Sequence, residues 1–325
     1  PPGWRATYAM RRASWIAVAA LPVAGMTMAT AALLAPAAAV AADAPKIGAQ
    51  MAKPLRAAQE AVNAKNWDEA LARLGEAAAI EPQTPYEAFM IDELGWFAML
   101  QKKDYAGAEK ALSEAVASGY VPEADLPQRY KALAQLNYQL KVYPKAVEYG
   151  NKVLALSPGS ADIGLIVAHS LYLQDDFAGA RDMVNKLAAA AATPDEQLLL
   201  IGLRSNYELK DRAGTMRSLE LLIRHHPAQK YWVDLLNNQL YETKTDRDLR
   251  ALYRLMAETS TLDTSEEYSE MATTLMTGGF PSEAKQMLER GIAAGAFKGD
   301  NLARAQSDLQ RARSGADADA KELPG

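Results

Sequence analysis

The sequence predicts an all-α protein built as a solenoid of repeated helix hairpins. Three observations support this fold class. Alanine-rich runs, only 20 glycines in 325 residues and an aromatic content of 7% favour helix over strand. An aromatic residue followed three positions later by alanine recurs along the chain. Prolines and helix-capping residues separate the helical stretches, where helices end and begin.

The first element, residues 1–42, has the pattern of an export signal. The expected start, Met10, is followed by two arginines and then by an uncharged run that ends at Ala42. A basic start, an apolar stretch and small residues at its end are typical of a secretory signal peptide, so we expect cleavage after Ala42. The uncharged run is long enough to span a bilayer, so an uncleaved inner-membrane anchor is the alternative.

The repeated unit follows, most clearly from Ala64 to Pro82. Its alanine recurs at positions 70, 108, 146 and 180, separated by 38, 38 and 34 residues. A small side chain suits the point where the two helices of a hairpin cross closely, and the aromatic residue closes the turn before it. The aromatic column is Trp67, Tyr105, Tyr143 and Phe177, and the alanine column is Ala70, Ala108, Ala146 and Ala180.

Helix boundaries are marked by proline and threonine. A helix that ends before Pro82, Pro158 or Pro227 cannot continue through it. Thr84 and Thr193 each precede a proline and stand three residues before a glutamate. That order predicts an N-terminal cap with proline in the first turn of the helix.

With these columns and closing prolines, the units resemble tetratricopeptide repeats. The resemblance implies a right-handed superhelical solenoid of about seven helix hairpins over residues 43–297. Four clear units end near Ala192, and three weaker ones follow, in which Ala251 and Ala284 align with the alanine column and Phe280 with the aromatic one. Each hairpin completes its core only against its neighbours. For residues 298–325 we expect a capping helix and a disordered end, SGADADAKELPG.

The period also aligns four tyrosines late in the first helices of successive units. Because first helices line the concave face in this family, the resemblance implies a groove that binds an extended segment of another protein. The alternative is that the tyrosines fill the interface between stacked hairpins. Lys131 and Arg204 are candidates for holding a carboxylate. The tyrosines are Tyr138, Tyr172, Tyr207 and Tyr241, and the polar residues one turn earlier are Gln135, His169, Arg204 and Asn238.

Other site chemistries have little support in the sequence. A formal charge of -5 without a basic block argues against a nucleic-acid partner, and the absence of cysteine excludes thiolate chemistry. The three histidines belong to no catalytic or metal-binding motif, and His225 and His226 suit a helix C-terminus. We therefore expect no catalytic residue, metal or cofactor.

The expected function is that of a non-enzymatic scaffold or adaptor in the bacterial cell envelope, located in the periplasm. Its partner is expected to be a protein or an extended peptide. Two alternatives stay open: a scaffold tethered to the membrane by an uncleaved N-terminal helix, and an accessory module that binds glycan or peptidoglycan.

Overall fold

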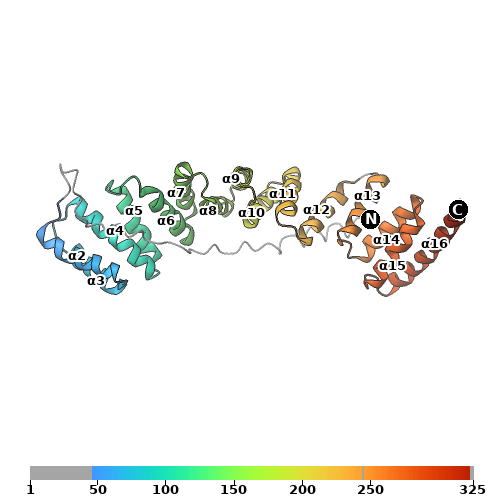
Figure 1. Ribbon diagram of the computed structural model, residues 1–325, viewed down its shortest axis with the longest axis horizontal. Coiled ribbons are helices and arrows are strands. Elements are labelled where there is room, and N and C mark those ends of the chain that lie inside the picture. The colour runs from blue at the N-terminus through green and yellow to red at the C-terminus, as the bar shows by residue number, and fades with distance from the viewer. Residues whose placement is uncertain (1–45, 244, 323–325) are drawn as a thin grey trace. The chain divides into compact units, whose positions relative to one another are not determined.

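The computed structural model describes residues 46–243 and 245–322 (Figure 1), and within them every regular element is an α-helix, fifteen in all. The predicted all-α class is confirmed. The predicted export signal, residues 1–42, lies outside the described residues. Among the helices in the described ranges, none combines the length and the apolar character that a bilayer crossing requires.

The chain divides into two compact units between Asp211 and Arg212. The first unit is a row of hairpins in which a first helix and a second helix alternate. The division falls in the turn of the predicted hairpin at residues 195–227, so its two helices belong to different units. The first unit contains α2 (Ala49–Asn63), α3 (Trp67–Ala78), α4 (Pro85–Gln101), α5 (Tyr105–Ala117), α6 (Leu126–Gln139), α7 (Tyr143–Leu156), α8 (Ala161–Tyr172), α9 (Phe177–Ala190) and α10 (Glu196–Glu208).

The second unit ends in a long helix where the sequence predicted a disordered tail. The helix α16 continues to Glu322, so that prediction is wrong for the stretch after Arg313. Ala305, Leu309 and Ala312 are buried on one side of α16, and the alanine-rich sequence that follows extends the helix. The second unit contains α11 (Arg212–His225), α12 (Gln229–Glu242), α13 (Asp246–Glu258), α14 (Ser265–Thr277), α15 (Pro281–Ala293) and α16 (Asp300–Glu322).

The alanine column is buried as predicted, with one exception. Ala251 is exposed, so its alignment with the column is wrong; α13 begins at Asp246 without an aromatic residue and turns Leu252 and Tyr253 into the core instead. The aromatic residues Trp67, Tyr105, Tyr143 and Phe177 each begin a second helix. No side-chain surface is exposed at the other column members, Ala70, Ala108, Ala146, Ala180 and Ala284.

The predicted cap at Thr84 is confirmed. Its hydroxyl accepts from the Glu87 amide at 3.3 Å, and the Glu87 carboxylate accepts from the Thr84 amide at 2.8 Å. The same carboxylate accepts from the amide of Gly48, which ties the start of α4 to the start of α2. The two backbone amides, Thr84 first, lower the pKa of Glu87.

The predicted cap at Thr193 is wrong. Asp195 caps α10 instead: its carboxylate accepts from the Leu198 amide at 3.0 Å, and the helix starts at Glu196. Asp is as good a cap as Thr, and here it stands one residue before the helix, whereas Thr193 stands three residues before it.

Candidate functional site

The aligned tyrosines lie near the ends of first helices. Tyr138 belongs to α6, Tyr172 to α8 and Tyr207 to the last turn of α10, and all three side chains are half-buried. These three helices belong to the first unit. Tyr241 lies in α12 of the second unit, and its side chain is outside what the structure describes.

Two of the tyrosines and one polar residue form a connected line across neighbouring hairpins, namely Tyr138, His169 and Tyr172. Tyr138 Oη and His169 Nδ1 are 2.7 Å apart and share a hydrogen bond whose donor depends on the imidazole tautomer. The two rings have centroids 5.8 Å apart. His169 also stacks on Tyr172, with centroids 6.5 Å apart and an interplanar angle of 24°. The line Tyr138–His169–Tyr172 thus joins α6 to α8.

The same tyrosines pack on the aromatic column of their own hairpins. The ring of Tyr138 lies 6.2 Å from that of Tyr143, and the ring of Tyr172 lies 5.4 Å from that of Phe177. The tyrosines therefore help to close each hairpin while keeping part of their surface accessible. Aromatic contacts of this kind fix the ring orientations before any partner binds.

The polar residues are more buried than a solvated row would be. Gln135, His169 and Asn238 are 9%, 8% and 6% exposed, and Arg204 is half-buried. The amide oxygen of Gln135 has no hydrogen-bond partner among the described residues. The Asn238 amide nitrogen donates to the carbonyl oxygen of Asp234 at 2.8 Å. A buried amide oxygen without a donor is costly, so Gln135 carries an unmet hydrogen-bonding capacity inside the first unit.

His169 acts as a neutral hydrogen-bonding group. Burial lowers the pKa of its imidazole, and the positive charge of Arg204 lowers it further. A histidine whose pKa falls below its ordinary value carries no charge at neutral pH. Lys131, a candidate for holding a carboxylate, already pairs with Asp162 of α8, with 2.6 Å between Nζ and Oδ2.

A buried polar cluster between α4 and α6 was not predicted from the sequence. Glu93 is 2% exposed and pairs with Arg129, whose guanidinium carbon lies 5.6 Å from the centre of the Trp96 ring. Burial raises the pKa of Glu93, while Arg129 acts in the opposite direction. The partners are 36 residues apart, and only the 38-residue interval between hairpins hints that they meet.

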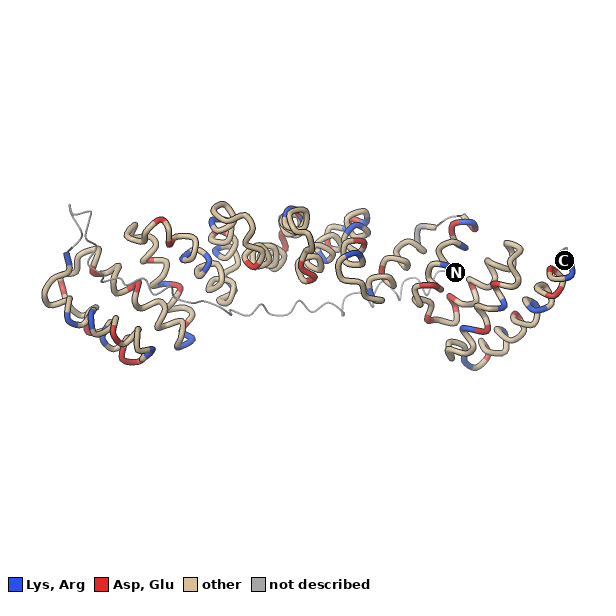
Figure 2. The backbone as a smooth tube through the Cα atoms, viewed as in Figure 1, with Lys and Arg blue, Asp and Glu red and all other residues tan. Residues whose placement is uncertain are grey.

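The chemistry of this surface is that of aromatic contact and hydrogen bonding. No group of three histidine or acidic residues in the described part of the chain could hold a metal ion. Basic and acidic residues are interspersed along the helices of each unit (Figure 2).

No protein-family model and no curated protein matches the sequence. Several solved structures resemble the chain. The structure of Naa15/Naa10 bound to HypK-THB aligns with a TM-score of 0.50 at 14% identity, over 79% of this chain and 45% of that one. A tetratricopeptide repeat protein from Parabacteroides merdae ATCC 43184 aligns with a TM-score of 0.41 at 14% identity, over 82% of this chain and 100% of that one. YrrB, described as a TPR protein with an unusual peptide-binding site, aligns with a TM-score of 0.44 at 12% identity, over 56% of this chain and 89% of that one.

These likenesses concern the fold alone. The buried alanine column, the second helices that begin at the aromatic column and the likeness to the Naa15/Naa10 structure identify the fold as a tetratricopeptide-like array of helix hairpins.

Proposed function

We propose that this tetratricopeptide-type repeat protein is a non-enzymatic scaffold that binds an extended segment of another protein across the first helices α6, α8 and α10. The observation that carries the proposal is the line Tyr138–His169–Tyr172, which spans two hairpins with half-buried aromatic rings. A surface that repeats from one hairpin to the next suits a ligand that is itself extended.

Each part of the line has a role in such binding. The tyrosine rings offer broad amphipathic contact, and their packing on Tyr143 and Phe177 means that little side-chain freedom is lost on binding. Arg204 adds a cation at the α10 end.

The proposed place of action is the bacterial periplasm, after removal of residues 1–42. The support is the basic start, the uncharged run and the small residues before Asp43. The mass of the protein isolated from cells tests this point. A chain that begins at Asp43 agrees with export and cleavage, whereas a chain that keeps the uncharged run favours a membrane-tethered scaffold.

The binding experiment is the double substitution Tyr172→Ala and Tyr207→Ala. Affinity for peptides from envelope proteins that the protein captures in a crosslinking experiment should fall by roughly 1–3 kcal/mol, about 5- to 150-fold, because aromatic anchors dominate such interfaces. The measurement is isothermal titration calorimetry, with the urea midpoint measured alongside.

The matched control is Tyr120→Ala, which removes another tyrosine of the first unit that is 38% exposed and lies outside α6, α8 and α10. The control should leave peptide affinity unchanged. A double variant that loses several kcal/mol of stability but binds peptides as before would show that the tyrosines only join the hairpins. Binding of soluble glycans in place of peptides would favour the glycan-binding alternative.

A further inference from the structure

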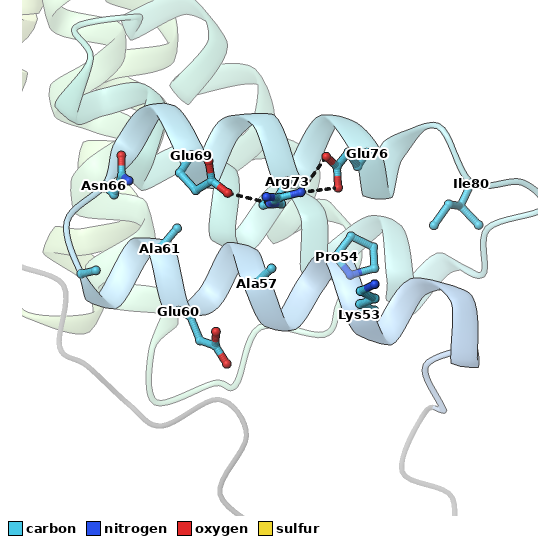
Figure 3. Close-up of a pocket in the computed structure, with 11 residues that line it drawn as sticks. Lys53, Pro54, Ala57, Glu60, Ala61, Asn66, Glu69, Arg73, Glu76 and Ile80 are labelled. Atoms are coloured by element: carbon cyan, nitrogen blue, oxygen red, sulfur yellow. Dashed lines mark hydrogen bonds and ion pairs between the residues drawn. The ribbon is translucent and has the colours of Figure 1, made fainter.

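A groove lies along the first hairpin, between α2 and α3. Its volume is about 790 Å³. Figure 3 shows the side chains of both helices along it, with small residues on α2 facing charged ones on α3. The groove is lined by Lys53, Pro54, Ala57, Glu60, Ala61, Ala64, Asn66, Glu69, Arg73, Glu76 and Ile80.

This hairpin is the first that the structure describes, and among residues 46–211 one side of α2 lacks the kind of neighbour that the later first helices have. The helices α4, α6, α8 and α10 each pack against the second helix of the hairpin before them, namely α3, α5, α7 and α9. Within the described residues no hairpin precedes α2. A repeat array usually ends in a covered or polar face, because the face of a terminal repeat would otherwise stay open.

The charged side chains of α3 that line the groove pair with one another. Arg73 lies between Glu69 and Glu76, with contacts of 2.7 Å and 2.9 Å, and Figure 3 shows the three in a row. Glu76 and then Glu69 raise the pKa of Arg73 by hydrogen bonding. This row therefore needs no charge from a partner.

The charges on α2 have no such partners. Lys53 and Glu60 are exposed, and in the described part of the chain neither side chain has a hydrogen bond or an ion pair. They are seven residues apart, which places them two turns apart on one face of the helix, roughly 10 Å along its axis. Ala57 lies between them. The face thus carries opposite charges on either side of a small residue.

We infer that this face binds the same face of a second copy of the chain. A two-fold axis near Ala57 makes the two α2 helices antiparallel and brings Lys53 of each copy opposite Glu60 of the other. Ala57 is half-buried and has a short side chain, so the two helix backbones can approach closely beside it. Such a contact is isologous, since one patch supplies both halves. A stable dimer buries roughly 800 Å² on each partner, so the contact includes α3 as well as α2.

This inference goes beyond the proposed function. It concerns α2 and α3, whereas segment binding concerns α6, α8 and α10. Loss of the dimer would leave the tyrosine surface in place, and loss of peptide binding would leave the dimer in place. The two ideas can therefore fail separately.

The test is sedimentation equilibrium over a concentration series, on the full chain and on a chain beginning at Asp43, which keeps every described helix. We expect a monomer–dimer equilibrium. Lys53→Glu and Glu60→Lys should each raise the dimer dissociation constant by about 10-fold or more, because two attractions become two repulsions. An equimolar mixture of these two variants should form a heterodimer, and the chain carrying both substitutions should dimerise like the original.

The matched control is Lys186→Glu, which reverses an exposed lysine on α9 and should leave the dissociation constant unchanged. Circular dichroism would verify that every variant folds. A dimer that forms only when residues 1–42 are absent would still support binding of a second copy to this face. In that case residues 1–42 would compete with the second copy for the face. The inference would be overturned if both chains were monomeric at all concentrations. It would also be overturned if the dimer dissociation constant were the same for the original chain, both single charge reversals and the doubly substituted chain.

Discussion

At the residue scale, two nearly identical pentapeptides, NYQLK at residues 137–141 and NYELK at residues 206–210, mark the ends of first helices. Their lysines, Lys141 and Lys210, have φ values of 60° and 56°. In the first, the Val142 amide donates to the Asn137 carbonyl oxygen at 2.8 Å, so the lysine is the left-handed residue that closes the helix. Asn137 and Asn206 are themselves buried, at 0% and 2% exposure. Each pentapeptide is thus a helix end, and in the first of them the tyrosine, Tyr138, contacts His169 of the next hairpin.

Lys141→Gly should stabilise the protein. A residue with a Cβ is strained by roughly 1 kcal/mol in the left-handed region, and glycine is not. We expect a gain of about 0.5–1 kcal/mol in the free energy of unfolding, measured from the urea midpoint. The control is Lys186→Gly, an exposed position inside α9, where glycine should cost about 1 kcal/mol. Equal losses at both positions would contradict the role given to the turn.

Asp92 links stability to pH. Burial, and then the charge of Glu114, raise its pKa from 3.8 to about 6. Because the folded state holds the Asp92 proton more tightly than the unfolded state, protonation of Asp92 stabilises the fold. This contribution to the free energy of unfolding is complete below pH 3.8 and is lost as the pH rises through about 6. Asp92→Asn should therefore raise the melting temperature at pH 8 and have little effect at pH 4. A gain of the same size at both pH values would show that the charge of Asp92 is not the cause.

At the element scale, the small residues set how closely helices pack. Gly150 of α7 faces α8, and a Cβ added there would lie 2.3 Å from Cγ2 of Val167, a residue with no exposed surface. Gly75 of α3 is also inside a helix, but a Cβ there would meet nothing within 4 Å. Glycine therefore serves a packing purpose at one of these positions and not at the other.

The pair gives a matched test of packing. Gly150→Ala should cost roughly 1–3 kcal/mol, because overpacking outweighs the better helix propensity of alanine. Gly75→Ala should gain about 0.5–1 kcal/mol from propensity alone. Chemical denaturation of both variants would check the two signs. If Gly150→Ala were also stabilising, α7 and α8 would have to be free to move apart.

At the scale of the whole molecule, stability should be local, since each hairpin packs mainly on its neighbours. Ala312→Asp buries a charge under α16, where the alanine has no exposed surface. We expect faster amide hydrogen exchange in α14, α15 and α16, with α2 to α5 unchanged. Gln310→Asp adds the same charge at an exposed position of α16 and should have little effect. Faster exchange throughout the chain would mean that the repeats unfold as a single cooperative body.

The sequence predicted most of the fold because local signals and the repeat period agree. The aromatic column gave the starts of four second helices, and the alanine column gave the contact between helices of a hairpin. The prediction from the sequence failed where a local signal was ambiguous. Thr193 and Asp195 both suit a cap, and only the position of α10 decides between them. No aromatic residue stands at the start of α13 to fix the register, so the alignment of Ala251 with the column is wrong.

The candidate site was only partly predictable. The period placed Tyr138, Tyr172 and His169 on neighbouring first helices, but it could not show that Tyr138 bonds to His169. Nor could it show that Glu93 and Arg129 meet inside the first unit. Such contacts depend on the distance and rotation between hairpins, which sequence spacing does not specify.

By itself, then, the sequence determined the all-helical class, the hairpin unit and the residues that repeat with it, since each follows from periodicity, side-chain size and helix-end chemistry. Only the tertiary structure decided which polar groups are buried, which aromatic rings touch, and that α2 and α3 leave a groove with unpaired charges beside it. The physical reason is that the former depend on neighbours along the chain, whereas burial and pairing depend on neighbours in space.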